Sequence, residues 1–199
     1  MITDINQLDF SKRYTYADYL TWQFDEMVEL IRGKVFRMSP APSQSHQRVS
    51  SNLLQEILPY FKGKPCRVYH APFDVRLPLP QEKQKGKKVD TVVQPDICVV
   101  CDLSKIDESG CLGAPDWVIE ILSKGTASKD LNEKFELYQH AGVKEYWIVH
   151  PHEATVLPYR LNKDGKYESL RAAPFSSEEK VPLGVFPGFE VDLKEVWGN

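Results

Sequence analysis

Apolar residues recur along the chain in patterns that each predict a helix or a strand. The strongest pattern covers residues 45–61, where Val49, Leu53 and Ile57 repeat at the three-and-four spacing of a helix that packs one face against a core. Further helices are predicted over residues 14–30 and 128–141, a hairpin turning at Arg32-Gly33 over 29–38, and strands over 66–77, 89–101, 116–122, 145–149, 155–161 and 167–172.

The order of these elements indicates an α/β (α+β) fold. A helix, three strands, a second helix and a further strand in succession favour a central mixed sheet with helices packed against it. The length of 199 residues suits one domain, which we expect to span residues 1–199. The short strands predicted over residues 151–199 form a C-terminal β extension in this scheme.

The charge and hydropathy of the chain limit where the protein is expected to reside and what it is expected to bind. No apolar run approaches the roughly 20 residues of a membrane span, and residues 1–10 lack the apolar segment of a secretory signal, so we expect a cytoplasmic protein without membrane contact. The formal net charge of −3 does not indicate a nucleic-acid-binding protein. It does not exclude one either, because the distribution of charge matters more than its sum.

The four cysteines predict neither a disulfide scaffold nor a metal site. Cys66, Cys98, Cys101 and Cys111 are even in number, but the chain is too long for such a scaffold and shows no sign of secretion. Cys98 and Cys101 form a C-x-x-C pair inside the apolar strand of residues 97–101. Residues three apart in a strand point to opposite faces, so this pair is not expected to bind one metal ion.

Two acidic residues stand inside apolar strands. Glu120 lies within the apolar run 116–122, where an ionised carboxylate is very costly without a partner. Asp96 follows Pro95 at the start of the apolar strand 97–101. Two acids directed from neighbouring strands into one cleft repel each other unless a divalent cation lies between them, and Mg²⁺ prefers such oxygen ligands. The alternative is that Asp96 caps a turn and Glu120 pairs with a lysine or arginine.

The strand that carries Glu120 and the helix after it contain a pattern that resembles a known family. The pattern comprises Pro115 to Ser123, Thr126, Asp130, Lys134, Tyr138, Ala141 to Val143 and Glu145 to Val149, joined by Glu29 to Ile31, Met38 to Pro40, His46 and Phe186 to Phe189. These residues are similar to the Uma-two family of restriction-endonuclease-like proteins in the PD-(D/E)XK nuclease superfamily. The resemblance covers nearly the whole chain from Glu29 onward and implies a restriction-endonuclease-like fold with its core at about residues 45–150.

The resemblance also implies a site and an activity. In that superfamily the aspartate of Pro-Asp and the acid of the (Asp/Glu)-x-Lys tripeptide bind Mg²⁺, and the lysine positions or activates water. Asp96 and Glu120 match the two acids, and the backbone carbonyl of Ile121 is expected to assist them in binding Mg²⁺ or Mn²⁺. We therefore expect a metal-dependent endonuclease that hydrolyses DNA phosphodiester bonds.

The lysine position of the tripeptide holds Leu122, so another residue has to supply the positive charge. Lys134 is the candidate, because on the predicted helix it lies one turn from both Asp130 and Tyr138 and can direct its ammonium along the sheet toward the acids. The alternative is a surface lysine paired with Asp130. Lys124 is nearer in sequence, but it stands where the family usually has proline.

Further residues are assigned accessory roles. Glu29 is expected to complete the metal shell, while His46 either contacts a phosphate, tunes the acid site or makes a local hydrogen bond at the start of its helix. Asp130 and Tyr138 are accessory candidates beside Lys134. A lysine-rich segment between two predicted strands either contacts DNA phosphates or is simply solvated, and its candidates are Lys83, Lys85, Lys87 and Lys88.

Two other functions are kept as alternatives. A non-catalytic nucleic-acid-binding or assembly module with the same fold would explain Leu122 and the acidic balance of the chain. A metal-dependent hydrolase acting on another substrate is the second alternative. A metal titration combined with a nuclease assay separates these hypotheses, and the choice between a monomer and a homodimer is left open.

Overall fold

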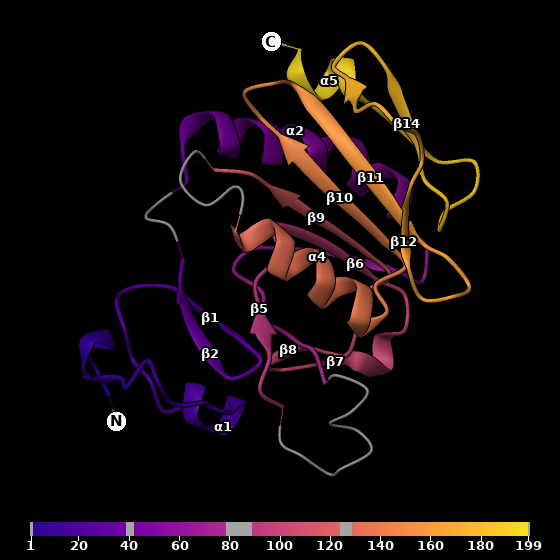
Figure 1. The fold of residues 1–199 in the computed structure, drawn as a ribbon. Coiled ribbons are helices and arrows are strands. Elements are labelled where there is room, and N and C mark those ends of the chain that lie inside the picture. Colours follow the sequence, from indigo (N-terminus) through magenta and orange to yellow (C-terminus); the bar gives the residue numbers. More distant parts are fainter. Residues whose placement is uncertain (1, 39–41, 79–88, 124–128, 199) are drawn as a thin grey trace.

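The computed structural model describes residues 2–38, 42–78, 89–123 and 129–198, and the side chains of the last segment from Asn132 onward. The lysines at the predicted phosphate-contacting segment (Lys83, Lys85, Lys87 and Lys88) and the alternative lysine Lys124 lie outside these residues. Within them the chain forms a mixed α+β fold, in which helices cover both faces of a large β-sheet (Figure 1).

The larger sheet is mixed, as predicted. Its order is β12-β11-β10-β9-β6-β3, with β13 paired to β11, and only β9 and β10 run parallel among these described strands. The strands are β3 (Arg67–His70), β6 (Ile97–Val100), β9 (Trp117–Ile121), β10 (Glu145–His150), β11 (Thr155–Leu161), β12 (Tyr167–Ser169) and β13 (Phe175–Ser176). β9 and β10 are buried on both faces, which is why their apolar runs are nearly continuous.

A second sheet carries the N-terminal hairpin, although the sequence predicts a single sheet. Its order is β2-β1-β5-β4-β8-β7, formed by β1 (Val28–Ile31), β2 (Lys34–Arg37), β4 (Val75–Arg76), β5 (Val92–Val93), β7 (Ile106–Asp107) and β8 (Gly110–Leu112). The predicted strands 66–77 and 89–101 each divide between the two sheets, with Pro72 and Pro95 at the breaks. Proline cannot donate to a β-ladder, which favours a break there. The chain therefore crosses between the sheets at residues 94–96, beside the candidate site.

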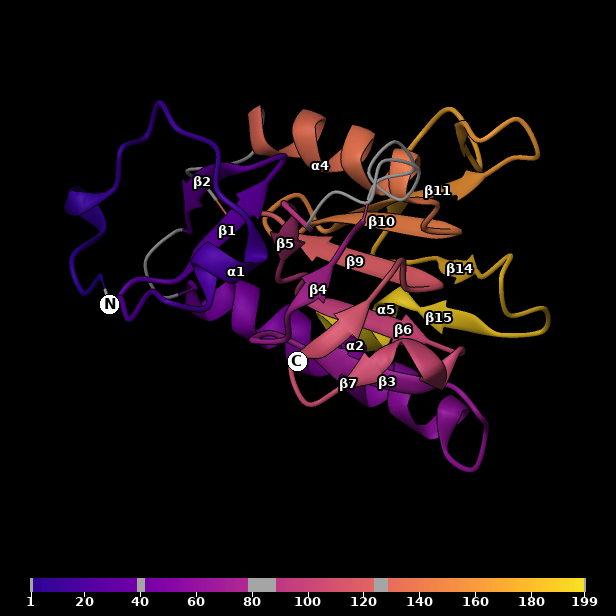
Figure 2. The same cartoon turned by 90° about the horizontal axis from the view of Figure 1, so that it is seen from below.

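The two long helices, α2 (Gln44–Phe61) and α4 (Lys129–Ala141), lie on opposite faces of the larger sheet (Figure 2). The apolar stripe of α2 shares a core cluster with Val99 and Trp117. Leu137 and Tyr138 of α4 share another cluster with Val118. The remaining elements are α5 (Leu193–Trp197), β14 (Lys180–Pro182) and β15 (Glu190–Asp192), which pack with α2, and the 3-10 helices η1 (Ile5–Gln7) and η2 (Leu103–Lys105). No helix among the described residues is long and apolar enough to cross a membrane.

The N-terminal helix is far shorter than predicted. The sequence predicts a helix over residues 14–30, but α1 covers only Tyr16–Tyr19, and the chain is extended again by β1. Thr15 caps this single turn through a capping box with Asp18. Trp22 and Phe24 alternate with polar residues, a period of two that suits extended chain, and both pack in a small N-terminal core cluster.

The hairpin of β1 and β2 turns at Arg32-Gly33, as predicted. Ile31 pairs with Lys34, and the two residues between them have φ angles of 50° and 78°. Two positive angles are typical of a tight two-residue hairpin turn, and glycine adopts the second without strain. The N–H of Gly33 donates a hydrogen bond of 2.7 Å to the carbonyl of Asp90. This contact fixes the hairpin beside β5.

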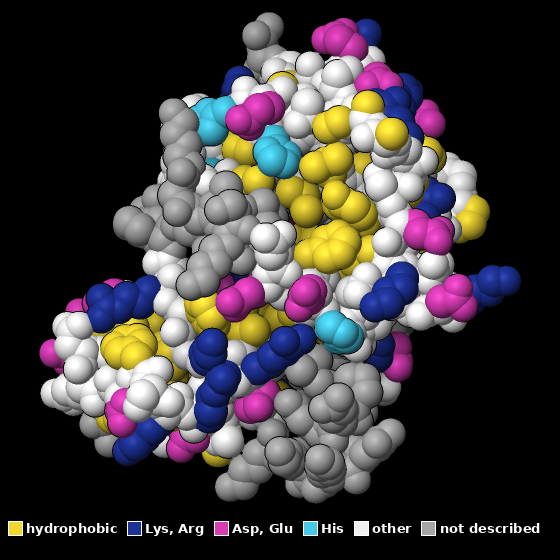
Figure 3. Space-filling model, in the orientation of Figure 1, with side chains coloured by type: hydrophobic (Ala, Val, Ile, Leu, Met, Phe, Trp, Pro, Cys, Tyr) yellow, Lys and Arg dark blue, Asp and Glu magenta, His cyan; other side chains and the backbone are white. Residues whose placement is uncertain are grey.

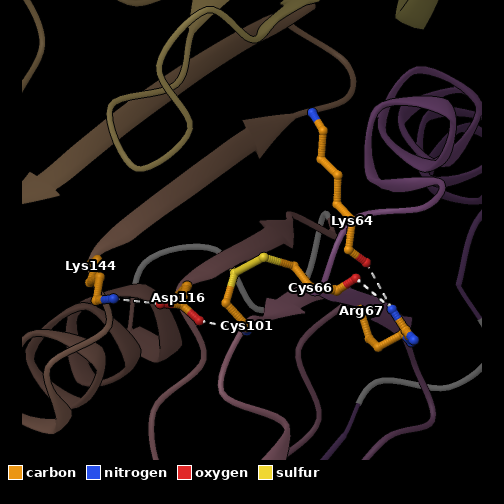
Figure 4. The surroundings of a disulfide bond; sticks show 6 residues. All are labelled: Lys64, Cys66, Arg67, Cys101, Asp116 and Lys144. Carbon is orange, nitrogen blue, oxygen red and sulfur yellow. Dashed lines mark hydrogen bonds and ion pairs between the residues drawn. A yellow bond between two sulfur atoms is a disulfide. The ribbon is translucent and has the colours of Figure 1, made fainter.

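Cys98 and Cys101 lie on opposite faces, as predicted for a strand. Cys98 belongs to the core cluster shared with α4, and Cys101 packs against the cluster shared with α2. Contrary to the expectation from the sequence, a disulfide is present, between Cys66 and Cys101 (Figure 4). The antiparallel pairing of β3 and β6 sets Arg67 opposite Val100, so the two cysteines at the next position stand opposite each other.

Candidate active site

A cleft of about 450 Å³ lies between the β1–β2 hairpin and the N-terminal half of α2. Apolar side chains of both elements, including Phe36 and Leu54, line it. Charged residues from five parts of the fold also line the cleft: Glu29 of β1, His46 of α2, Asp96 before β6, Glu120 of β9 and Lys134 of α4. The fold therefore brings together both predicted acids, the predicted lysine and two of the accessory candidates.

Asp96 is held at the start of β6 by two contacts. Its Oδ2 accepts a hydrogen bond of 2.7 Å from the backbone N–H of Ile121, and its Oδ1 lies 3.2 Å from Nε2 of His46. β6 and β9 are antiparallel, with Ile97 opposite Ile119, so Asp96 and Glu120 meet at neighbouring positions of adjacent strands. This register is the physical reason why two acids far apart in the sequence share one cleft.

Glu120 is buried, with 8% of its surface exposed. Its Oε1 accepts hydrogen bonds from the hydroxyl of Tyr138 at 2.6 Å and from the ammonium of Lys134 at 3.0 Å. The pKa of Glu120 is raised to about 7, mainly because the carboxylate is buried; Lys134 and the Tyr138 hydrogen bond lower this pKa, and repulsion by Asp96 and Glu29 raises it. The site therefore holds more negative charge than its lysine offsets.

Lys134 reaches across from α4 to two carboxylates. Its Nζ lies 3.0 Å from Oε1 of Glu120 and 2.9 Å from Oε1 of Glu29, and its side chain is only 12% exposed. Burial lowers the pKa of this lysine, but the charges of the two glutamates outweigh burial and raise the pKa above its ordinary value. The expected contact between Lys134 and Glu120 is present, and Lys134 carries a firm positive charge there.

Glu29 faces the lysine, and Gln94, for which the sequence predicts no role, supports it. Oε1 of Glu29 accepts a hydrogen bond of 2.9 Å from the backbone N–H of Gln94. The side-chain amide of Gln94 donates in turn to Asp74 at 2.7 Å. The position of Gln94 directly before Pro95-Asp96 is the one sequence signal that could have drawn attention to it.

His46 directs its side chain at the acid site. Ser43, not His46, makes the local cap of α2, since its Oγ accepts from the backbone N–H of His46 at 3.3 Å. Burial lowers the pKa of His46, but the hydrogen bond and charge of Asp96, a backbone hydrogen bond with Ile121 and the charge of Glu120 outweigh it and raise the pKa. Among the described residues its buried Nδ1 has no hydrogen-bond partner. Of the alternatives for His46, this geometry favours tuning of the acids.

Of the other residues considered in the sequence, some lie in the site and some lie outside it. Tyr138 belongs to the site through its hydrogen bond to Glu120. The side chain of Asp130 lies outside the described residues, so its accessory role stays a prediction. Leu122, at the position of the missing lysine, is half-buried and packs against the core cluster shared with α4.

The donor set fits a hard divalent cation. Among the described residues no three His, Cys, Asp or Glu side chains are grouped to hold a metal ion. The predicted ligands are two carboxylates and the carbonyl of Ile121, and Mg²⁺ often binds through one or two carboxylates together with water and substrate oxygens. When Asp96, Glu120 and Glu29 are all ionised they outnumber Lys134, and one negative charge then remains even with a protonated histidine beside them. That surplus of negative charge favours a cation.

Glu120→Gln is expected to stabilise the metal-free protein above neutral pH. Folding raises the pKa of Glu120 from 4.5 to about 7. Between these two pH values the folded protein binds more protons than the unfolded chain, so its free energy of unfolding falls as the pH rises. This decrease in the free energy of unfolding is at most about 3 kcal/mol. Glutamine keeps an acceptor for Tyr138 but does not ionise. Chemical unfolding across this pH window in the presence of EDTA measures the effect, with the exposed Glu26→Gln as control. Parallel pH profiles for wild type and Glu120→Gln would contradict the prediction.

Comparison with known proteins identifies the family. The Uma2 family, described as "Putative restriction endonuclease", matches residues 16–194. The uncharacterized protein slr1290 of Synechocystis sp. (strain ATCC 27184 / PCC 6803 / Kazusa) is 24% identical over 179 residues, which is 88% of either chain. The crystal structure of "a putative nuclease belonging to DUF820" from Anabaena variabilis ATCC 29413 has the same fold, with a TM-score of 0.69 at 21% identity over 92% of this chain and 97% of that chain. Because the family match covers most of the sequence, the chain belongs to the Uma2 family, the family that its sequence pattern resembles.

Proposed function

We propose that this protein is a metal-dependent endonuclease that hydrolyses DNA phosphodiester bonds. The observation that carries the proposal is the convergence of two strand-borne acids and a helix-borne lysine in one cleft, with the ammonium of Lys134 at 3.0 Å from Glu120. Leu122 cannot supply a charge, and Lys134 supplies it from another element. Membership of a family described as "Putative restriction endonuclease" supports the same reaction class.

Asp96, Glu120 and the carbonyl of Ile121 are the residues that would hold Mg²⁺ or Mn²⁺. A divalent cation bound there would lower the pKa of a coordinated water and offset charge on a phosphate. The protein prepares both acids for this role, because Ile121 and His46 orient Asp96 while Tyr138 orients Glu120. A carboxylate that is already oriented loses little rotational freedom when it binds a cation.

Lys134 acts in the proposal as a donor and a fixed charge, not as a base. Its raised pKa keeps the ammonium protonated at neutral pH. An ammonium has three N–H donors, and the two carboxylates use two of them. The third can donate to the attacking water or to a phosphate oxygen, whose charge grows in the transition state.

A basic surface near α4 is the proposed place for DNA phosphates. Lys and Arg side chains gather below α4 on the face shown in Figure 3. Arg32 lies 3.4 Å from Nδ1 of His140 at the end of α4, and Arg13 donates to the carbonyl of Arg32 at 2.6 Å. Exposed guanidinium groups that are fixed in this way, each at its own hydrogen-bond partner, suit contacts to a phosphate backbone in spite of the net charge of −3.

A cleavage assay tests the proposal. Purified protein is incubated with supercoiled plasmid and with single-stranded circular DNA, in Mg²⁺, in Mn²⁺ and in EDTA. We expect nicked and linear products only with a metal ion, and none with the Asp96→Asn variant. DNA binding without cleavage in either metal would contradict the proposal and favour the non-catalytic binding module. That alternative draws support from Leu122 and from the pairing of the Lys134 ammonium with two carboxylates.

A further inference from the structure

We infer that Glu29 is the positioning residue of the site: it anchors the ammonium of Lys134 and is not itself a metal ligand. The inference rests on the proposed function for its kinetic consequence, but the anchoring itself can be tested without cleavage. It starts from the 2.9 Å contact between Lys134 and Glu29, in which both side chains are buried, at 12% and 7% exposed.

Lys134 needs a second residue to hold its ammonium in place because its backbone lies on α4 and not on the strands that carry the acids. A lysine on α4 must extend a flexible four-carbon side chain to the cleft, and fixing such a side chain costs rotamer entropy. A lysine at the position of Leu122 would instead be held by its strand. Two carboxylates reach the ammonium, and one of them, Glu120, is also a proposed metal ligand. Negative charge that Glu120 shares with a cation is no longer fully available to Lys134, which leaves Glu29 as its anchor.

The backbone of Gln94 holds the carboxylate of Glu29 in place. The backbone N–H of Gln94 donates to the same Oε1 that accepts from Lys134. The amide of Gln94 is bound to Asp74 at 2.7 Å and lies 3.5 Å from the hydroxyl of Tyr19. Contacts therefore connect Asp74, Gln94 and Glu29 to Lys134, close to residues 94–96, where the backbone crosses to the larger sheet.

The contacts of Glu29 also argue against a place in the metal shell. Its Oε1 already has two donors, one of them a cation. Asp96 shows a different pattern, with donors on both oxygens but no lysine among the described residues. Glu120 is paired with the same ammonium, but it stands opposite Asp96 on the adjacent strand, whereas Glu29 belongs to the other sheet. In the described part of the chain no three His, Cys, Asp or Glu side chains are grouped to hold a metal ion, so Glu29 does not form such a group with the two acids.

The test compares Glu29→Ala and Glu29→Gln with Glu26→Ala, an exposed glutamate three residues earlier on the same segment. The first readout is the rate at which an amine-acylating ester labels Lys134 in metal-free protein, measured by peptide mass spectrometry. Loss of a charge-assisted hydrogen bond should raise this rate about 10- to 100-fold in Glu29→Ala. Glu29→Gln keeps an acceptor oxygen and should recover most of the protection, while Glu26→Ala should match wild type.

The second and third readouts separate anchoring from metal binding. Calorimetry should give Mg²⁺ affinities for both Glu29 variants within about threefold of wild type. DNA cleavage by Glu29→Ala should lose about 10- to 100-fold in kcat with KM nearly unchanged, and Glu29→Gln should rescue part of it. Circular dichroism checks the fold, and Glu29→Gln carries the test if the alanine variant does not fold.

Each outcome decides the inference. Unchanged labelling of Lys134 in Glu29→Ala overturns it. Loss of Mg²⁺ affinity by more than about tenfold in Glu29→Gln also overturns it and assigns Glu29 to the metal shell. If wild type cleaves no DNA but Glu29→Ala still exposes Lys134 to the reagent, the anchoring role stands and the nuclease proposal alone fails.

Discussion

Lys134→Ala is expected to lower the kcat of metal-dependent DNA cleavage by about 10²- to 10³-fold, the loss typical of removing one preorganised donor from a transition state. The ammonium of Lys134 lies at the proposed ligand Glu120, and its raised pKa keeps it charged at neutral pH. Steady-state kinetics on a fluorescent oligonucleotide duplex measure the change. We expect the fold to persist, because Glu120, whose pKa is already about 7, can take up a proton when its ammonium partner is removed.

Two further variants show whether the loss of activity comes from the charge of Lys134 or from its packing. Lys134→Met keeps the apolar stem of the side chain and removes only the charge, so it should be as inactive as the alanine variant. Lys163→Ala removes an exposed lysine from a turn and should retain wild-type activity. Cleavage by Lys134→Met within a few-fold of wild type would show that the charge is not used, and the role of Lys134 would then be structural.

The second large effect concerns metal binding. Asp96→Ala and Glu120→Ala should each weaken Mg²⁺ or Mn²⁺ binding by more than about 100-fold, since removal of even an outer-shell partner of a ligand costs about 10- to 100-fold. Each variant removes one of the two charged donors of the proposed site, and neither the carbonyl of Ile121 nor water replaces that charge. Isothermal titration calorimetry provides the affinities, with the exposed Asp164→Ala as the matched control. Wild-type affinity in both variants would mean that the metal site lies elsewhere or does not exist.

The meeting of the two acids could be predicted because it follows from local patterns. Glu120 interrupts a run that is buried on both faces, and Asp96 stands at the start of another such run. Central strands of this kind pair with each other, and the observed register of Ile97 with Ile119 brings the acids together. The position of α2 follows in the same way, from the spacing of its own apolar residues.

The partners of Lys134 could not be derived locally. Glu29 lies on a hairpin in the second sheet, and only the pairing of that hairpin with β5, just before the chain crosses to β6, brings it to α4. The same reason explains the disulfide that the sequence did not predict. Cys66 and Cys101 are 35 residues apart, and they meet only because β3 is the neighbour of β6. Contacts between sheets and between edge strands depend on topology, which periodicity does not encode.

The dispersal of the site over the chain has a consequence for the cell that makes this protein. Glu29, Asp96 and Lys134 come from two sheets and a helix, and Lys134 is synthesised well after the other two residues. A nascent or partly unfolded chain therefore has no assembled centre, because each charged group is then separated from its partners by solvent. An enzyme that cuts DNA would therefore be inactive until its folding is complete. For the same reason, any movement that separates the two sheets would lower its activity at once.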